Sequence, residues 1–290
     1  MRKKRPNEIR TKKKRLRGKW IALEILMICV GLALLTVAVL NAGWISTASP
    51  VPPPETTTES STAATTTEEP TTTEPETTTQ PPLDIDGLRD KKLVALTFDD
   101  SPQRTQTTRL LDFLKEQDVR VTFFMVGVNV KDAPEIVRRA AAEGHQVASH
   151  TYNHKDLTKL GPERLAQEIG DTAALIEELT GARPTAMRPP YGAQNAAVQA
   201  AAGTPLILWS IDPKDWSTRD ADKSYSRVLA NVRDGDIVLL HDLYRESVDA
   251  AERIIPALKE QGYTFVTVDQ LLAARGGAKP GDVVFNRPRG

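Results

Sequence analysis

From residue 93 onward, short apolar runs alternate with longer amphipathic segments. Helical spacing of apolar residues predicts helices between these runs, the longest at 162–180. This alternation is typical of an α/β fold with a parallel sheet and right-handed crossovers. About seven such units predict a barrel or incomplete barrel in a domain at 83–275, followed by a loose tail at 276–290. The apolar runs predict strands at 93–98, 121–126, 146–149, 185–188, 205–211, 236–240 and 264–268.

One much longer apolar run lies near the start of the chain. Residues 20–45 carry no strongly polar side chain apart from Glu24 and Asn41, and about 20 apolar residues cross the ~30 Å core of a bilayer. A transmembrane helix is therefore predicted at 20–45. Eleven Lys and Arg among residues 1–19 predict a basic cytoplasmic segment and an exported remainder. The alternative is a cleaved signal peptide, because small residues follow at 46–48.

Composition separates this run from the predicted domain. Residues 46–82 contain 14 Thr, 8 Pro, 6 Glu and 4 Ser, which bury too little apolar surface to fold, so a disordered stalk is predicted. The whole chain balances 38 Lys and Arg against 38 Asp and Glu, and we expect neither a nucleic-acid partner nor an obligate protein partner. The only cysteine, Cys29, lies in the predicted membrane segment. We expect a single-pass protein of the cell membrane whose folded domain is extracellular.

Polar and ionisable side chains directly follow five of the predicted strands. The carboxyl ends of parallel strands meet at one rim of a barrel, so these clusters are expected to form one site. Within them, the planar cation of Arg188 is suited to orient a carboxylate. The clusters are Asp99-Asp100, His150-Thr151-Tyr152-Asn153-His154, Arg188-Pro189-Pro190-Tyr191-Gly192, residues 212–216 and His241-Asp242.

His150 and His154 are four residues apart, a spacing that suits a shared metal ion. Alone, such a pair is more often structural or exposed, but a carboxylate at another strand end supplies a third ligand and leaves a fourth position for water, as in catalytic zinc sites. The adjacent Asp99 and Asp100 both reach one site only if the strand bends. Ser101-Pro102 provides a break. The competing interpretation is that the Asp pair caps the next helix.

Five motifs in this order resemble those of the polysaccharide deacetylase family, whose catalytic region is the NodB homology domain (carbohydrate esterase family 4). The resemblance covers about Leu93 to Leu272 and implies a distorted (β/α) barrel that removes N-acetyl groups from sugars with a metal ion. The family often has glycine where this chain has Ser101, which changes the backbone freedom of the loop without removing a reactive group. The motifs are Thr97-Phe98-Asp99-Asp100, His150-x-x-x-His154, Arg188-Pro189-Pro190-Tyr191, Asp212-x-x-Asp215-Trp216 and Leu239-x-His241.

The resemblance also implies a role for each motif residue and a cofactor, Zn²⁺ or another divalent transition metal such as Co²⁺. His145, outside the motifs, has no assigned chemistry and is interpreted as structural. The implied roles are metal ligation by Asp100, His150 and His154, general base catalysis by Asp99 oriented by Arg188, protonation of the leaving amine by His241 oriented by Asp215, oxyanion stabilisation by the Tyr191 N–H, and an acetyl-methyl pocket walled by Trp216 and Leu239.

The expected substrate is an N-acetylated cell-wall glycan, with N-acetylglucosamine of peptidoglycan favoured because the predicted anchor and stalk hold the domain near that polymer. The enzymatic alternatives are a chitin or chito-oligosaccharide deacetylase and an O-acetyl esterase acting on acetylated xylan, since the same water activation cleaves esters. A catalytically silent glycan-binding module is the alternative from a different class.

Overall fold

The computed structural model describes residues 85–289. The predicted basic segment at 1–19, transmembrane helix at 20–45 and stalk at 46–82 lie outside the described residues. Within residues 85–289, no helix is both long enough and apolar enough to span a bilayer.

The core of the fold is a parallel five-stranded sheet built around β1. The apolar run that predicts the first strand is buried along nearly its whole length, which is expected of a strand covered on both faces. Strands β3, β2, β1 and β5 follow one another across the sheet, and β6 pairs with the first residues of β1. The strands are β1 (Lys92–Ser101), β2 (Thr122–Met125), β3 (Gln146–Ser149), β5 (Asp236–His241) and β6 (Tyr263–Phe265).

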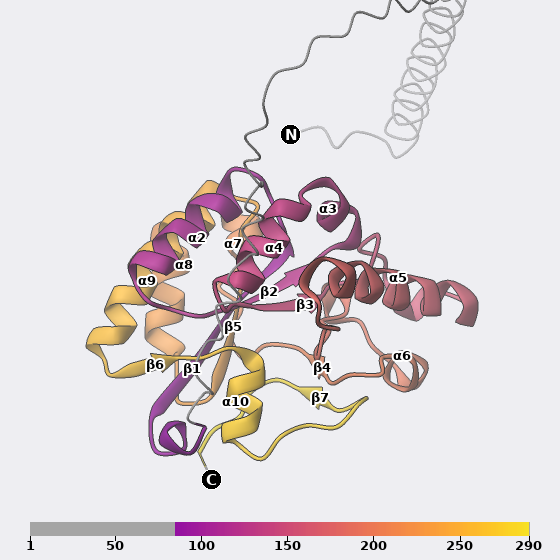
Figure 1. Cartoon of the computed structure of the whole chain (residues 1–290). Helices are drawn as coiled ribbons and strands as arrows, with labels where there is room; N and C mark the ends of the chain where they lie inside the picture. The colour runs from indigo at the N-terminus through magenta and orange to yellow at the C-terminus, as the bar shows by residue number, and fades with distance from the viewer. Residues whose placement is uncertain (1–84, 290) are drawn as a thin grey trace, which may run out of the picture. The chain divides into compact units, whose positions relative to one another are not determined.

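The two faces of β1 serve two hydrophobic clusters, because successive side chains of a strand point to opposite faces. Val94, Leu96 and Phe98 pack in the larger cluster, which includes α2, α4 and α9, whereas Leu93 and Ala95 pack with α10. Figure 1 shows α2, α8 and α9 grouped at one side of the sheet and α5 beside β3. The helices are η1 (Asp86–Leu88), α2 (Gln106–Glu116), α3 (Gly127–Asp132), α4 (Pro134–Ala142), η2 (Leu157–Lys159), α5 (Pro162–Thr180), η3 (Pro190–Gly192), α6 (Ala196–Ala201), α7 (Asp215–Thr218), α8 (Ala221–Asn231), α9 (Arg245–Glu260) and α10 (Val268–Ala274).

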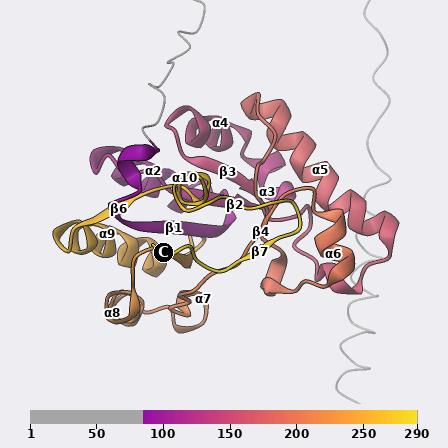
Figure 2. The ribbon, with the colours of Figure 1, turned by 90° about the horizontal axis from the view of Figure 1, so that it is seen from below.

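The predicted α/β fold with a parallel sheet is confirmed, whereas a regular barrel of seven units is not. The predicted strand at 185–188 is reduced to isolated bridges that join Met187 to β3 and to Leu206. The predicted strand at 205–211 contains only β4 (Leu206–Ile207), which pairs with β7 (Val283–Val284) in a separate two-stranded sheet next to α6 (Figure 2). Prolines before and after 185–188 and at residue 205 lack the N–H that a continuous ladder requires.

The segment after residue 275 belongs to the fold, so the prediction of a loose tail is wrong. Val284 is fully buried in the cluster beneath β1, and the Arg287 N–H donates to the carbonyl of Gly235 over 2.8 Å. Gly235 has a φ of 83°, and a Cβ there would lie 2.0 Å from the Arg287 carbonyl oxygen, so the two segments touch backbone to backbone. The paired segments are far apart in the sequence and only a few residues long, so no periodic pattern of apolar residues predicts the pairing.

Candidate active site

The carboxyl ends of β1, β3 and β5 open into one cavity of about 360 Å³. Because parallel strands end at the same edge of a sheet, residues far apart in sequence meet there. Most of the predicted site residues lie in its wall. The lining residues are Asp99, Asp100, His150, His154, Tyr191, Trp209, Asp212, Lys214, Trp216, Leu239, His241 and Tyr244.

Asp100, His150 and His154 form a compact group of metal-type donors, with ligand atoms all within 4.8 Å of one another. The Nε2 atoms of His150 and His154 lie 3.6 and 3.4 Å from Oδ1 of Asp100. The Nδ1–H of His150 donates to the carbonyl of Arg188 over 2.7 Å, since a carbonyl only accepts. Nε2 therefore presents its lone pair to the group. Two imidazoles and one carboxylate with this outer hydrogen bond fit a divalent transition-metal ion such as Zn²⁺.

The backbone that presents these donors is a bent strand and a loop. The register of β1 against β2 shifts between Asp99 and Ser101, and Asp100 has a φ of 68°, so the predicted bend is present and lets both aspartates face the cavity. The two histidines are not on a helical turn. Residues 150–154 form a loop in which Thr151 and His154 have φ values of 65° and 54°.

Arg188 lies fully buried behind Asp99. One terminal nitrogen donates to Oδ1 of Asp99 over 2.6 Å and to Thr97 Oγ1 over 2.9 Å. The other two guanidinium nitrogens, Nε and Nη2, donate to the carbonyls of Ile207 and Leu208, each over 2.9 Å. Burial lowers the pKa of Arg188 and the charge of Asp99 opposes that shift. The guanidinium therefore holds the Asp99 carboxylate from behind and leaves Oδ2 directed to the histidine side, 3.6 Å from His150 Nε2.

His241 is held by a buried carboxylate. Its Nδ1–H donates to Oδ1 of Asp215 over 3.0 Å, and its backbone N–H donates to Oδ2 over 2.8 Å. Ser247 Oγ also donates to Oδ2, over 2.6 Å, a contact that the sequence motifs do not reveal. Burial alone lowers the pKa of His241, but the hydrogen bond and charge of Asp215, with Asp99 and Asp100 adding to them, raise it to about 9. At neutral pH the imidazole is thus a proton donor.

The rim of the cavity is aromatic and open. The side chains of Tyr191 and Trp216 are 71% and 46% exposed, whereas Leu239 is buried in the wall. Tyr191 has a φ of 62° and packs its ring edge against His154, with centroids 4.8 Å apart. Trp209 and Tyr244 extend this aromatic lining. Neither belongs to one of the five motifs, and Trp209 lies inside a predicted strand, so the sequence does not predict them as site residues.

His145 lies away from the cavity, in agreement with its structural interpretation. Its ring packs edge-on against Phe123, and its Nδ1 accepts from the Val121 N–H over 3.3 Å. Burial, together with the charges of Arg120 and Arg139, lowers the pKa of His145 to about 3, so the ring is neutral at physiological pH.

Known proteins resemble this chain in sequence. The polysaccharide deacetylase family model matches residues 86–205. The peptidoglycan-N-acetylglucosamine deacetylase PgdA of Listeria monocytogenes is 43% identical over 183 residues, which cover 63% of this chain and 39% of that protein. A peptidoglycan-N-acetylglucosamine deacetylase of Bacillus cereus is 39% identical over 191 residues, which cover 63% of this chain and 89% of the relative. The chain belongs to the polysaccharide deacetylase family.

Solved structures of the polysaccharide deacetylase family share the fold. A family 4 acetyl xylan esterase from Clostridium thermocellum, in complex with a cobalt ion, is 33% identical, with a TM-score of 0.65 over 68% of this chain and all of that one. The matched part of this chain spans about two fifths of the length of the Listeria relative.

The Asp215 carboxylate should control the protonation of His241. In the metal-free protein, we expect the His241 imidazole to titrate near pH 9, and Asp215→Asn to bring its pKa well below that value, because burial then acts without the opposing charge. Histidine ring signals followed by NMR against pH measure both values. His145, whose pKa is lowered to about 3, serves as an internal control that should not respond. An unchanged His241 titration in Asp215→Asn would contradict this account.

Proposed function

We propose that this chain is a metal-dependent hydrolase that removes N-acetyl groups from cell-wall glycan, with N-acetylglucosamine of peptidoglycan as the substrate. The observation that carries the proposal is the joint presence, in one cavity, of a three-donor metal group, a carboxylate held by Arg188 and an imidazole held by Asp215. Together these three groups meet the two requirements of amide hydrolysis, because the attacking water must be activated and the amine must leave protonated. The Listeria and B. cereus relatives support the choice of sugar.

Asp100, His150 and His154 would hold the ion. When bound there, a divalent transition metal supplies Lewis-acid activation of water and of the acetamide carbonyl. Zn²⁺ suits two imidazoles and one carboxylate, and the structure of the Clostridium relative in complex with a cobalt ion supports Co²⁺ as the alternative.

Two side chains that are not among the three metal donors, Asp99 and His241, transfer the protons. Asp99 accepts a proton from the attacking water while Arg188 holds its other oxygen, and a bond forms between the water oxygen and the acetyl carbon. The Tyr191 N–H stabilises the developing oxyanion. His241 then donates its Nε2 proton to the sugar nitrogen as the carbon–nitrogen bond breaks, which yields acetate and a free amine. Trp216 and Leu239 wall the acetyl methyl.

Acetate release tests the substrate proposal. Purified residues 83–290 with zinc should release acetate from peptidoglycan, and chitin oligomers, acetylated xylan and a glycan with N-acetylmuramic acid as its only amide sugar serve as parallel arms. His150→Ala and His154→Ala should lose both bound zinc and turnover, whereas Asp99→Asn should keep zinc and lose turnover by roughly 10²-fold or more. Ester-only turnover would favour the acetylxylan esterase alternative, and no turnover on any substrate would favour a silent glycan-binding module.

The general-acid role of His241 predicts a dependence on the leaving group. An amine leaves poorly unless protonated, but a phenolate departs with little help. His241→Ala should therefore keep far more activity on an aryl acetate than on an acetamide, whereas Asp99→Asn should impair both, because both need water activation. Rates of the two variants on matched amide and aryl ester substrates measure this. Equal losses on both substrates would move His241 to a positioning or oxyanion role.

We further propose that the domain is displayed on the cell surface by a single transmembrane helix at residues 20–45 and a stalk at 46–82. The apolar run, the basic residues before it and the Thr- and Pro-rich composition after it support this topology. Such placement would bring the cavity to cell-wall glycan.

Protease treatment of intact cells tests this topology. A protease should release a soluble, active fragment, because the low-complexity stalk exposes its backbone. A cytoplasmic protein followed in the same samples controls for lysis. Protection of the domain in intact cells, with cleavage only after lysis, would reverse the orientation.

A further inference from the structure

The ligand loop, residues 150–154, carries two of the three metal donors and has little regular structure of its own. Two of its residues, Thr151 and His154, have left-handed backbone conformations. Such conformations cost free energy for residues other than glycine and persist where the surroundings fix them. The contacts that fix the loop therefore determine where the His154 imidazole stands.

Backbone groups of the neighbouring helices hold the middle of the ligand loop. At the start of α3, the N–H groups of Gly127 and Val128 donate to the carbonyls of Thr151 and Tyr152, over 2.9 and 3.0 Å. From the other side, the Tyr152 N–H donates to the carbonyl of Glu168 in α5 over 3.0 Å. These contacts are main chain to main chain, and the close approach requires glycine at residue 127, where a Cβ would lie 2.5 Å from the Tyr152 ring.

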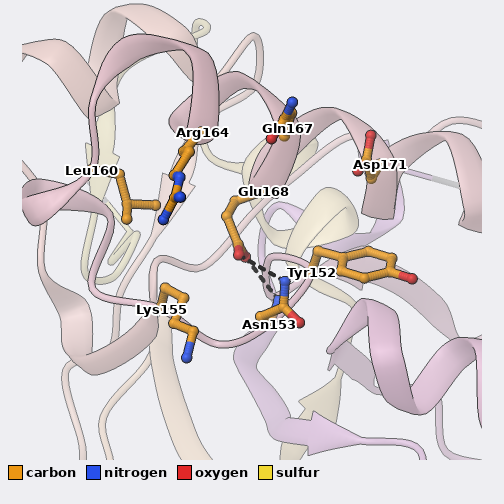
Figure 3. A pocket seen from close by; sticks show the side chains of 8 residues that line it. All are labelled: Tyr152, Asn153, Lys155, Leu160, Arg164, Gln167, Glu168 and Asp171. Atoms are coloured by element: carbon orange, nitrogen blue, oxygen red, sulfur yellow. Dashed lines mark hydrogen bonds between the residues drawn. The ribbon is translucent and has the colours of Figure 1, made fainter.

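The next residue, Asn153, is held by a side chain instead. Its backbone N–H donates to Oε2 of Glu168 over 2.8 Å, and its Nδ2 donates to Oε1 over 2.9 Å. Figure 3 shows the Glu168 side chain extending from α5 to Asn153 at the floor of a surface hollow. Glu168 is only 8% exposed, and in the described part of the chain no cation pairs with it. Both oxygens of the Glu168 carboxylate thus accept hydrogen bonds from Asn153, the residue that precedes His154.

We propose that Glu168 is a positioning residue for the metal ligand His154 and acts through the two amide groups of Asn153. Ligands of a metal ion need outer contacts that fix their orientation, and carboxylates are common partners in that role. His150 obtains its outer contact from the Arg188 carbonyl, whereas no hydrogen bond from the His154 ring to an outer partner is found among residues 85–289. The fixed backbone at Asn153 supplies the missing constraint. This inference rests on the proposed metal site.

Zinc affinity of purified residues 83–290 tests the role directly. We expect Glu168→Ala to weaken zinc binding by about 10- to 100-fold, the usual effect of removing an outer contact. Glu168→Gln should stay within about threefold of the parent, because its Oε1 accepts from the Asn153 N–H and its Nε2 can donate to Oδ1 of Asn153 once that side-chain amide turns over. Glu178→Ala removes the same charge from an exposed position of α5 and should bind zinc normally. Competition with a chromophoric chelator gives each dissociation constant.

Two further measurements separate positioning from loss of the fold. Asn153→Ala changes an exposed residue, and Glu168→Ala should add little to it beyond the backbone N–H contact, so the two effects should be clearly less than additive. The visible spectrum of the Co²⁺-loaded protein should be altered in Glu168→Ala and restored in Glu168→Gln. Excess zinc should return part of the lost turnover.

The possible results separate failure of the Glu168 positioning role from failure of the proposed metal site. If His154→Ala loses zinc but Glu168→Ala binds it within twofold of the parent, the positioning role is wrong and the metal site stands. If Glu168→Gln is as weak as Glu168→Ala, the charge rather than the hydrogen bonding matters, which also overturns the proposal. If zinc binding survives in both His150→Ala and His154→Ala, the proposed metal site itself fails.

Discussion

The buried guanidinium of Arg188 is the contact on which the rest of the site depends. It is the largest fully buried side chain in the described part of the chain, and its donors reach β1, the carbonyl of Ile207 in β4 and the carbonyl of the next residue, Leu208. Its own backbone carbonyl accepts a hydrogen bond from the Nδ1–H of His150. A buried charge that loses its partner typically costs about 3–5 kcal/mol. Asp99, His150 and the junction of the two sheets are therefore stabilised together.

This arrangement explains why the two sheets can be joined by isolated bridges and still position a site accurately. A regular ladder fixes strands through many backbone contacts, and the prolines around Met187 prevent one. The guanidinium supplies the missing connection with directional hydrogen bonds, since its planar fork constrains angle as well as distance. The interruption between the two sheets and the buried charge are thus two aspects of one structural solution.

Much of the site was predictable from sequence because it follows from the parallel sheet. Asp99, His150 and His241 each follow an apolar run, and parallel strands bring such positions to one edge. Contacts made by helices back onto that edge were not predictable. Ser247 reaches Asp215 from α9, and Glu168 reaches Asn153 from α5, and neither residue differs in its sequence surroundings from an ordinary helical position. The segment after residue 275 could not be predicted for a different reason: its strand has only two residues, too few to show a repeating pattern of apolar and polar positions.

Two histidines in the cavity show how a single hydrogen-bond partner determines a role. His150 and His241 both donate from Nδ1, the first to a neutral carbonyl and the second to a carboxylate. A carbonyl orients the ring and leaves the Nε2 lone pair for a cation, as a metal ligand requires. A buried carboxylate instead favours the imidazolium, as the pKa of about 9 for His241 shows, so Nε2 carries a proton to give. In the proposed mechanism, the same type of side chain therefore serves as a metal ligand and as an acid in one cavity. The difference comes from the Arg188 carbonyl at His150 and the Asp215 charge at His241.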